Sequence, residues 1–200
     1  MRRVCLTGIA AICAVYGQQT ASLPRPVDPA HPLISPDGSY ALYGIPDAAQ
    51  LWLENRTTHE RRLVLDATIQ TMTLAWSPDS VAFAVNDRWA SDQEIAYIYT
   101  AATLDRLELR APVLAADPQA ARFVPGPGSA PHSYFHTIRW LDPENVELQL
   151  HGHTDGVREG NLVRPGECFD LRYRVSRGGK AHKVSQTVLP AGSQACAAID

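Results

Sequence analysis

Two histidines near residue 152 are separated by a single glycine, and side chains at this spacing leave the same face of an extended strand. His151 and His153, with Asp155 following, would supply nitrogen and oxygen ligands for a divalent metal, and His136 lies upstream. The spacing is shorter than in zinc motifs, and Gly152 is equally typical of a bulge that leaves the imidazoles bonded to backbone. We therefore expect structural or partner-contacting histidines and no metal or cofactor; His151, His153 and Asp155 are the candidates should a metal bind.

A tryptophan lies in a polar segment between two predicted strands. Trp89 follows Asp87 and Arg88, and an exposed indole there is typical of a binding hot spot, the alternative being a cap over the core. Asp87, Asp92 and Glu94 could form the carboxylate pair of a glycoside hydrolase. The chain has no Gly-x-Ser-x-Gly elbow, no glycine-rich phosphate loop and no His-Glu-x-x-His pair. We therefore expect binding without catalysis, and the alternative is a small hydrolase that uses acidic residues or a histidine-bound metal.

Turns of the type Ser-Pro-Asp introduce strands in two places, at residues 35–38 and 77–80, and a looser version covers residues 141–144. Proline fixes φ in such a turn, and aspartate accepts hydrogen bonds from nearby backbone N–H groups. Period-2 alternation of aromatic and β-branched residues then predicts three four-stranded antiparallel meanders and an all-β fold. The predicted strands cover residues 40–43, 50–54 and 61–65, with a fourth strand if one begins at residue 33; residues 71–76, 81–85, 95–99 and 107–110; and residues 136–140, 146–150, 168–175 and 180–188.

The loops between second and third strands would gather at the end of the molecule opposite the Ser-Pro-Asp turns. The proline- and glycine-rich connector over residues 111–131, in which residues 114–121 favour a short helical turn, arrives there too. Loops held by a rigid scaffold commonly carry binding groups. We therefore expect one binding end, with the candidate residues Asp47, Asp87, Arg88, Trp89, His136, His151, His153 and Asp155.

The Ser-Pro-Asp-Gly and Trp-Ser-Pro-Asp-Ser turns, each heading an apolar strand, resemble the TolB-type β-propeller repeats of exported bacterial proteins. The two motifs are spaced by about 40 residues, the length of one four-stranded propeller blade. Such families close a ring of six or more blades, whereas this chain offers three recognisable units. A partial or small propeller, an open stack, a ring completed by another copy and a twisted sandwich are therefore all compatible with the sequence.

The first residues have the pattern of an export signal. Arg2 and Arg3 precede a short apolar run, which is too short to span a bilayer, and small residues follow, so cleavage is expected after Gly17 or Ser22. Lipidation at Cys13 is disfavoured by the bulky residue before it. The expected organisation is a signal peptide over residues 1–22, a proline-rich linker or extended arm over 23–32, the repeat domain over 33–190 and a tail over 191–200.

The net charge of the chain and its expected export limit the classes of molecule that it could bind. The net charge of −3 is small and the basic residues are scattered, which argues against nucleic acid and anionic membranes. We expect a periplasmic or secreted protein that binds an envelope protein, a secreted protein or a peptide. An inhibitor or immunity protein for a secreted toxin is a further alternative, and association of copies is expected if the blades do not close alone.

Removal of the signal peptide would leave Cys168 and Cys196 as the remaining cysteines, and an oxidising compartment favours a disulfide between them. We predict that the mature protein, denatured and treated with an alkylating reagent in the absence of reductant, gains no alkyl group by mass spectrometry. After reduction it should gain two. Two labelled thiols without reductant would contradict the disulfide.

Overall fold

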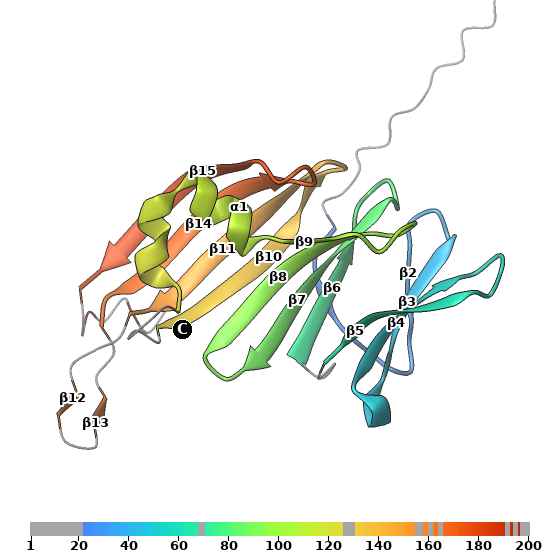
Figure 1. Cartoon of the computed structure of the whole chain (residues 1–200), viewed down its shortest axis with the longest axis horizontal. Helices are drawn as coiled ribbons and strands as arrows, with labels where there is room; N and C mark the ends of the chain where they lie inside the picture. The colour runs from blue at the N-terminus through green and yellow to red at the C-terminus, as the bar shows by residue number, and fades with distance from the viewer. Residues whose placement is uncertain are drawn as a thin grey trace, which may run out of the picture.

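The computed structural model describes residues 22–67, 71–125, 131–154, 158–159, 162–163, 166–190, 193 and 196. Within these residues the all-β prediction is confirmed, and three antiparallel meanders follow one another along the chain (Figure 1). The strands of the first are β2 (Leu33–Ile34), β3 (Tyr40–Ile45), β4 (Gln50–Asn55) and β5 (Arg61–Asp66); of the second, β6 (Met72–Trp76), β7 (Ala82–Ala90), β8 (Gln93–Thr100) and β9 (Arg106–Glu108); and of the third, β10 (His132–Asp142), β11 (Asn145–His153), β14 (Cys168–Ser176) and β15 (Ala181–Leu189).

The first meander is a separate four-stranded sheet, whereas the second and third share one larger sheet. They are joined by a short parallel pairing, in which Ser133 and Tyr134 of β10 lie beside Gln93 and Glu94 of β8. Beyond this pairing β8 takes β9 as its neighbour, so β10 diverges from β8. The meanders form an open, partly propeller-like arrangement that does not close into a ring (Figure 1).

The Ser-Pro-Asp turns have the hydrogen bonds that the sequence predicts. In the first turn Ser35 Oγ donates to Asp37 Oδ1 at 2.7 Å, and Asp37 Oδ1 also accepts from the backbone N–H of Ser39 at 3.0 Å. This backbone bond, together with the Ser35 hydroxyl, lowers the pKa of Asp37 to about 2. The second turn repeats the first, with Ser77 Oγ donating to Asp79 Oδ1 at 2.6 Å.

The predicted polar break over residues 86–93 is mostly strand. β7 continues to Ala90 and β8 begins at Gln93, which leaves a two-residue hairpin. The polar side chain of Asn86 can lie within a strand because Thr137, in the distant strand β10, forms hydrogen bonds with it. Asn86 Oδ1 accepts from the Thr137 N–H at 2.8 Å, and Asn86 Nδ2 donates to the Thr137 carbonyl at 3.1 Å. Similar extensions start β10 at His132 and carry β11 to His153.

The middle meander carries large side chains on one face, and on the other face four alanines together with Ile98. The large face packs against Leu42, Leu51 and Leu53 of the first meander. The small face belongs to the larger core, which it forms with the third meander and the helices. The large-face residues are Leu74, Trp76, Phe83, Val85, Tyr97 and Tyr99, and the small-face alanines are Ala75, Ala82, Ala84 and Ala96.

Two tryptophans connect each meander to the preceding one. The indole of Trp76 donates to the carbonyl of Leu33 at 3.0 Å, and the indole of Trp140 donates to the carbonyl of Ala75 at 3.0 Å. Leu33 and Ala75 each lie two residues before the serine of their own turn. The two bonds are therefore equivalent, and both indoles are buried as structural residues, in agreement with their repeat position.

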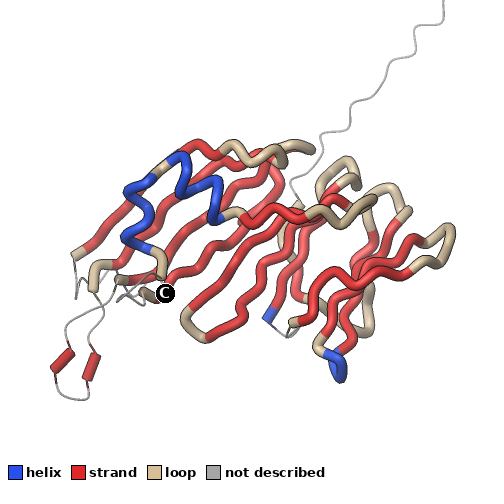
Figure 2. The backbone as a smooth tube through the Cα atoms, viewed as in Figure 1, coloured by secondary structure: helices blue, strands red, loops and turns tan. Residues whose placement is uncertain are grey.

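Two short helices in the connector cover the apolar face of the third meander (Figure 2). They are α1 (Arg110–Ala116) and the 3-10 helix η3 (Pro118–Phe123), longer than the single turn predicted here. Phe123 packs against Phe169 of β14, with tilted rings whose centroids are 4.4 Å apart. Asp117, between the helices, accepts from the Tyr173 hydroxyl at 2.9 Å and pairs with Lys183 at 2.9 Å.

The segment over residues 23–32 runs as an extended arm beside the first strands of two meanders. The carbonyl of Ser22 accepts from the Trp140 N–H at 3.1 Å, and the Val27 N–H donates to the Met72 carbonyl at 3.2 Å. Between them, β1 (Arg25–Pro26) pairs with β6. Proline is compatible with this pairing because β1 is the edge of the sheet.

Cys168 and Cys196 lie at disulfide distance, with Cα atoms 5.6 Å apart, inside the usual range. Cys168 is the first residue of β14, so the bond ties Cys196 to the start of this strand. Their separation is 28 residues, and closing a loop of that length stabilises by about 3–4 kcal/mol in the chain-entropy model. The rest of the predicted tail, Ser193 excepted, and residues 1–21 lie outside the described residues.

We predict that Trp140→Phe lowers the free energy of unfolding by about 2 kcal/mol, because it removes the indole donor of a buried carbonyl and leaves a small cavity. Urea unfolding followed by circular dichroism measures this loss. Trp89→Phe is the matched control, since Trp89 is exposed and should change stability by less than about 0.5 kcal/mol. Equal losses in the two variants would contradict the role given to the Trp140 bond.

Candidate functional site

A hollow of about 300 Å³ opens where the second and third meanders meet. Strands β7, β8, β10 and β11 each contribute side chains to its lining, and all of these lie near the β7–β8 hairpin, the start of β10 and the end of β11. We call it the histidine hollow. It is lined by Arg88, Glu94, His132, Tyr134, His151 and His153.

Strand register brings these residues together. His132 is opposite His153 in the β10–β11 pairing, and Tyr134 is opposite His151. The His132 and His153 rings stack with centroids 4.2 Å apart, and the Tyr134 and His151 rings lie 5.2 Å apart. The parallel pairing places Glu94 beside Tyr134, so the row of side chains continues onto β8.

Gly152 makes the stacked histidine pair possible. It has φ of +136°, and a Cβ atom at this position would lie 1.9 Å from the carbonyl oxygen of His132. A bulge was one interpretation of Gly152, but the residue is in regular pairing with Ser133 and Phe169. Because it has no side chain, the neighbouring backbone can approach closely. Without that approach, His132 and His153 could not stack as they do.

Hydrogen bonds and ring contacts fix one side of the hollow. Arg88 lies over the Tyr134 ring, with its guanidinium carbon 5.0 Å from the centroid, and Arg88 and the Tyr134 hydroxyl both donate to the Ser91 carbonyl. Glu94 Oε1 accepts from His136 Nδ1 at 2.8 Å, and a carboxylate acceptor requires the proton on that nitrogen. Arg88 and Glu94 thus give the hollow one cationic and one anionic group.

His151 is held neutral by its surroundings. Burial lowers the pKa of His151, although the nearby Glu94 carboxylate acts in the opposite direction. Its Nδ1 atom is buried and has no hydrogen-bond partner within the described residues. A neutral imidazole with an unsatisfied nitrogen can donate a hydrogen bond to a group that enters the hollow, or accept one from it.

The structure brings some of the predicted binding residues together and separates others. Arg88, His151 and His153 line the hollow, and His136 is bonded to its Glu94. Trp89, which follows Arg88 in β7, has 55% of its surface exposed. Asp47, exposed in the 3-10 helix η1 (Pro46–Ala48) of the first meander, is not among the lining residues. Asp155 lies outside the described residues.

Asp87 does not reach the surface, contrary to the expectation of a binding role. It is 6% exposed, and burial followed by the charge of Glu94 raises the pKa of Asp87. Its position in β7 follows the large-face residues Phe83 and Val85, so its side chain leaves the strand on their face. The expectation of a loop at this point concealed this alternation.

The sequence analysis singled out neither His132 nor Tyr134, and it considered Glu94 only as one carboxylate of a possible pair. The available signal was the alternation His132, Tyr134, His136, which places three polar rings on one face of a strand. The segment was treated as part of a connector because prolines precede it. Its pairing with β11 and β8 could not be derived locally.

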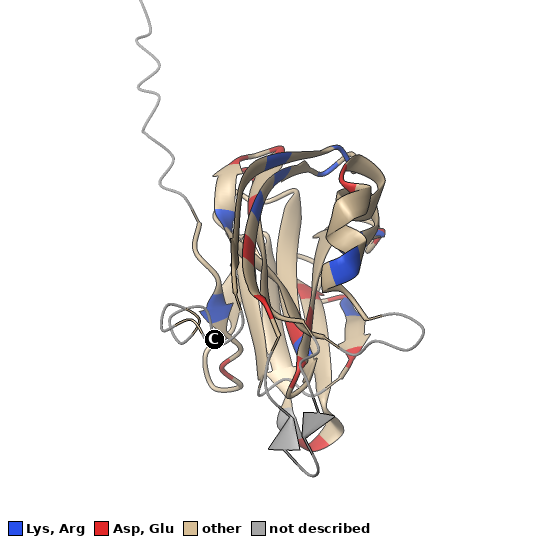
Figure 3. Cartoon of the chain, turned by 90° about the vertical axis from the view of Figure 1, so that its left-hand side faces the viewer, with Lys and Arg blue, Asp and Glu red and all other residues tan. Residues whose placement is uncertain are grey.

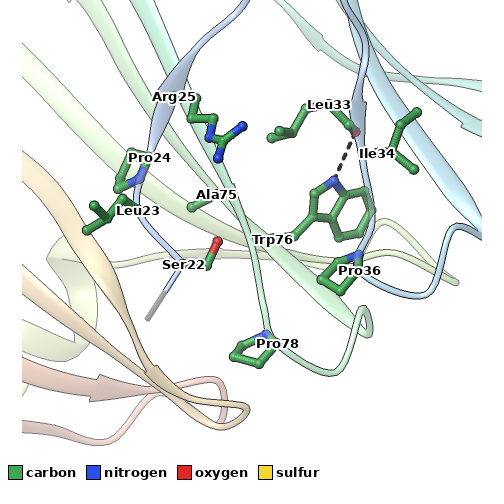
Figure 4. Close-up of a pocket in the computed structure, with 10 residues that line it drawn as sticks. All are labelled: Ser22, Leu23, Pro24, Arg25, Leu33, Ile34, Pro36, Ala75, Trp76 and Pro78. Carbon is green, nitrogen blue, oxygen red and sulfur yellow. Dashed lines mark hydrogen bonds between the residues drawn. The ribbon is translucent and has the colours of Figure 1, made fainter. Parts of the chain in front are cut away.

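A larger hollow of about 620 Å³ lies between the arm and the first two meanders (Figure 4). Figure 4 shows the prolines of both Ser-Pro-Asp turns, Pro36 and Pro78, at its edge and the Trp76 indole bonded to the Leu33 carbonyl. Its lining is mainly aliphatic and proline side chains, with Arg25 as the charged member. None of the predicted binding residues lines it, and few polar groups are available there to orient a ligand.

The lining of the histidine hollow limits the chemistry that it could perform. Its six lining residues include no serine, threonine or cysteine that could act as a nucleophile. No three His, Cys, Asp or Glu side chains within the described ranges are placed to hold a metal ion. The bonded Glu94 and His136 pair could exchange a proton with a bound group.

No helix in the described part of the chain is long and apolar enough to cross a membrane.

We predict that Gly152→Ala destabilises the protein by about 3 kcal/mol or more, because the new methyl group meets a backbone carbonyl at a φ that disfavours side chains. Gly178→Ala is the matched control. A Cβ there would lie 3.8 Å from the Ser176 hydroxyl, so stability should change by less than about 0.5 kcal/mol. Thermal and urea unfolding measure both, and a fully stable Gly152→Ala protein would refute the close approach.

Comparison with known proteins gives distant structural likeness only. No family model matches the chain, and no curated protein matches it by sequence. Among solved structures, the chain is similar to the crystal structure of TolB from Acinetobacter baumannii, at 14% identity and a TM-score of 0.33. The match covers 84% of this chain and 44% of that one, so the chain spans less than half of that protein's length. A TM-score below 0.5 does not establish a shared fold, and the fold described here therefore rests on the strand order.

Proposed function

We propose that the protein is an exported, non-enzymatic binding protein that recognises an envelope protein, a secreted protein or a peptide at the histidine hollow. The observation that carries this proposal is the exposed indole of Trp89, next to Arg88 in the strand that lines the hollow. Exposed tryptophan and arginine beside a polar hollow are the residue types that dominate binding hot spots.

The chemistry of the hollow supports a peptide-like ligand. Arg88 can pair with a carboxylate, Glu94 can accept from a cation or an amide, and His151 has an unsatisfied nitrogen. Trp89 offers an apolar surface beside these groups. A chain segment that presents one apolar side chain and several backbone amides matches this combination.

Export is supported by two separate features of the chain. The N-terminal residues have the pattern of a signal peptide, and Cys168 and Cys196 lie at disulfide distance. A periplasmic or secreted location would give the hollow access to envelope and secreted proteins. If the protein acts as an inhibitor or immunity protein, its partner would be a secreted toxin.

A small hydrolase is the alternative function, and the His136 and Glu94 pair is the observation that favours it. A carboxylate that orients an imidazole is a common acid–base arrangement. The lining of the hollow has no serine, threonine or cysteine, and a water molecule bound by the His136 and Glu94 pair would be the nucleophile in this alternative. Binding requires no such addition, and we therefore place it first.

The test is affinity capture from envelope extract with three baits: the wild-type protein, Trp89→Ala and Val184→Ala. Val184 is the matched control because it is 67% exposed on β15, outside the hollow. We expect one partner to be retained by the wild-type and Val184→Ala baits and reduced by about tenfold or more with Trp89→Ala.

Quantitative mass spectrometry and a purified binding assay with the captured partner measure this difference. Equal retention by all three baits would contradict the proposed surface. Processing of the captured partner by wild-type protein, lost in Glu94→Gln, would instead support the hydrolase. Unchanged thermal unfolding of the Trp89→Ala variant would show that the lost capture does not result from unfolding.

A further inference from the structure

Arg88 in the histidine hollow has no carboxylate partner among the residues that the structure describes. Its guanidinium carbon lies 5.0 Å from the centroid of the Tyr134 ring, and one guanidinium nitrogen donates to the Ser91 carbonyl at 3.0 Å. The Tyr134 hydroxyl donates to the same carbonyl at 2.9 Å, so one acceptor holds both side chains. The remaining N–H groups of Arg88 form no hydrogen bond within the described residues. Arg88 is therefore exposed, oriented and able to bind a group that enters the hollow.

The acidic side chains nearest in β7 and β8 do not neutralise Arg88. Glu94 lines the hollow, but its Oε1 atom accepts from His136 at 2.8 Å. Asp87 is buried, and burial raises the pKa of its carboxyl group. Asp92, in the β7–β8 hairpin, is not among the lining residues. The charge of Arg88 thus lacks a counter-charge within the hollow itself.

The arginines of the third meander have the opposite arrangement. Arg139 pairs with Glu147 at 2.8 Å, and Arg172 pairs with Asp170 at 3.0 Å. Figure 3 shows basic and acidic positions along the strands of this meander, with the helices on the other side. These guanidinium groups are already satisfied by the chain's own carboxylates. Arg88 has no such partner, so its charge remains available to a ligand.

The stacked histidine pair adds a neutral hydrogen-bond donor to the same hollow. His132 is exposed, and within the described residues its ring nitrogens have no hydrogen bond or ion pair. Stacking on the His153 ring, with centroids 4.2 Å apart, holds the imidazole in place. The N–H group of a neutral imidazole donates to an anionic oxygen. The hollow therefore presents one fixed cation and one fixed neutral donor.

The size and charge of the hollow favour a carboxylate over other charged groups. A volume of about 300 Å³ is at the lower end for ligand pockets, and it suits one side chain or one chain end. Among the described residues that line the hollow, Arg88 alone is a lysine or arginine. One permanent positive charge matches a carboxylate better than a phosphate group, which carries nearly two negative charges. A cationic group would be repelled by Arg88.

We propose that the histidine hollow binds a carboxylate group of the partner, from an acidic side chain or from a peptide C-terminus, with Arg88 as the main contact. This inference rests on the proposed binding function and adds the chemistry of the ligand. Arg88 can form two parallel N–H bonds to the two carboxylate oxygens. Because Tyr134 and Ser91 already hold its guanidinium, little side-chain freedom is lost on binding. His132 supplies a further donor.

Titration of the mature protein with three short peptides tests the proposal, with NMR of the histidine ring signals as the readout. The peptides are acetyl-Leu-Gly-Gly-Gly with a free C-terminus, acetyl-Leu-Gly-Asp-Gly-amide and the neutral acetyl-Leu-Gly-Gly-Gly-amide. At least one acidic peptide should bind about tenfold more tightly than the neutral one, because bonds to charged groups are stronger. The preferred peptide identifies the source of the carboxylate. Equal affinity for all three, or no shift up to about 20 mM, would overturn the proposal.

Arg88→Gln should weaken binding of the preferred acidic peptide by about tenfold and leave the neutral peptide unaffected, because the amide carries no charge. Arg25→Gln is the matched control. Arg25 is also exposed and without an ion pair within the described residues, but it lines the other hollow. This variant should bind all three peptides as the wild-type protein does. An Arg88→Gln protein that keeps the preference for an acidic peptide would overturn the proposal.

The capture experiment separates this inference from the binding function on which it rests. Loss of the partner with Trp89→Ala but full retention with Arg88→Gln would contradict the carboxylate and leave the binding surface in place. Full retention by both variants would contradict the surface itself. Unchanged thermal unfolding of Arg88→Gln would show that any lost binding does not result from unfolding.

Discussion

The alternation of large and small side chains in the middle meander is the constraint on which the rest of the structure depends. Its aromatic and leucine face fills the wide gap to the first meander, and its alanine face lets β10 approach closely. The indole of Trp140 can reach the Ala75 carbonyl because Ala75 presents only a methyl group to the larger core. Strands β6, β7 and β8 therefore determine the contacts with both neighbouring meanders. The hollow, where β8 and β10 diverge, follows from the contact with the third meander.

Much of the fold could be predicted from local sequence. The two Ser-Pro-Asp turns and the period-2 strands on each side appear where the residues place them, because each turn has its own serine and aspartate hydrogen bonds between residues two to five positions apart. The extension of β7 through Asn86 could not be predicted in the same way. Its polar side chain is satisfied by Thr137, 51 residues further along the chain. The parallel pairing of β8 with β10 is nonlocal for the same reason.

The candidate site was predictable in its location and only partly in its members. His151 and His153 share a face as their spacing requires, and Arg88 lies near them. Asp87 is buried because it continues the alternation of β7, where a loop was expected. Tyr134 becomes part of the site through its register with His151, which depends on where β11 ends. Residue types therefore indicated at which end of the molecule the candidate site lies. Strand pairing decided which side chains meet there.

The indole bonds between meanders run in one direction along the chain. Trp76 donates to a carbonyl 43 residues earlier, and Trp140 donates to one 65 residues earlier. During synthesis, each acceptor therefore emerges from the ribosome before its donor, so assembly can proceed vectorially from the first meander to the last. Truncation has unequal effects: removal of the last meander deprives neither remaining unit of an acceptor, whereas removal of the first takes away the acceptor of Trp76 and exposes its indole.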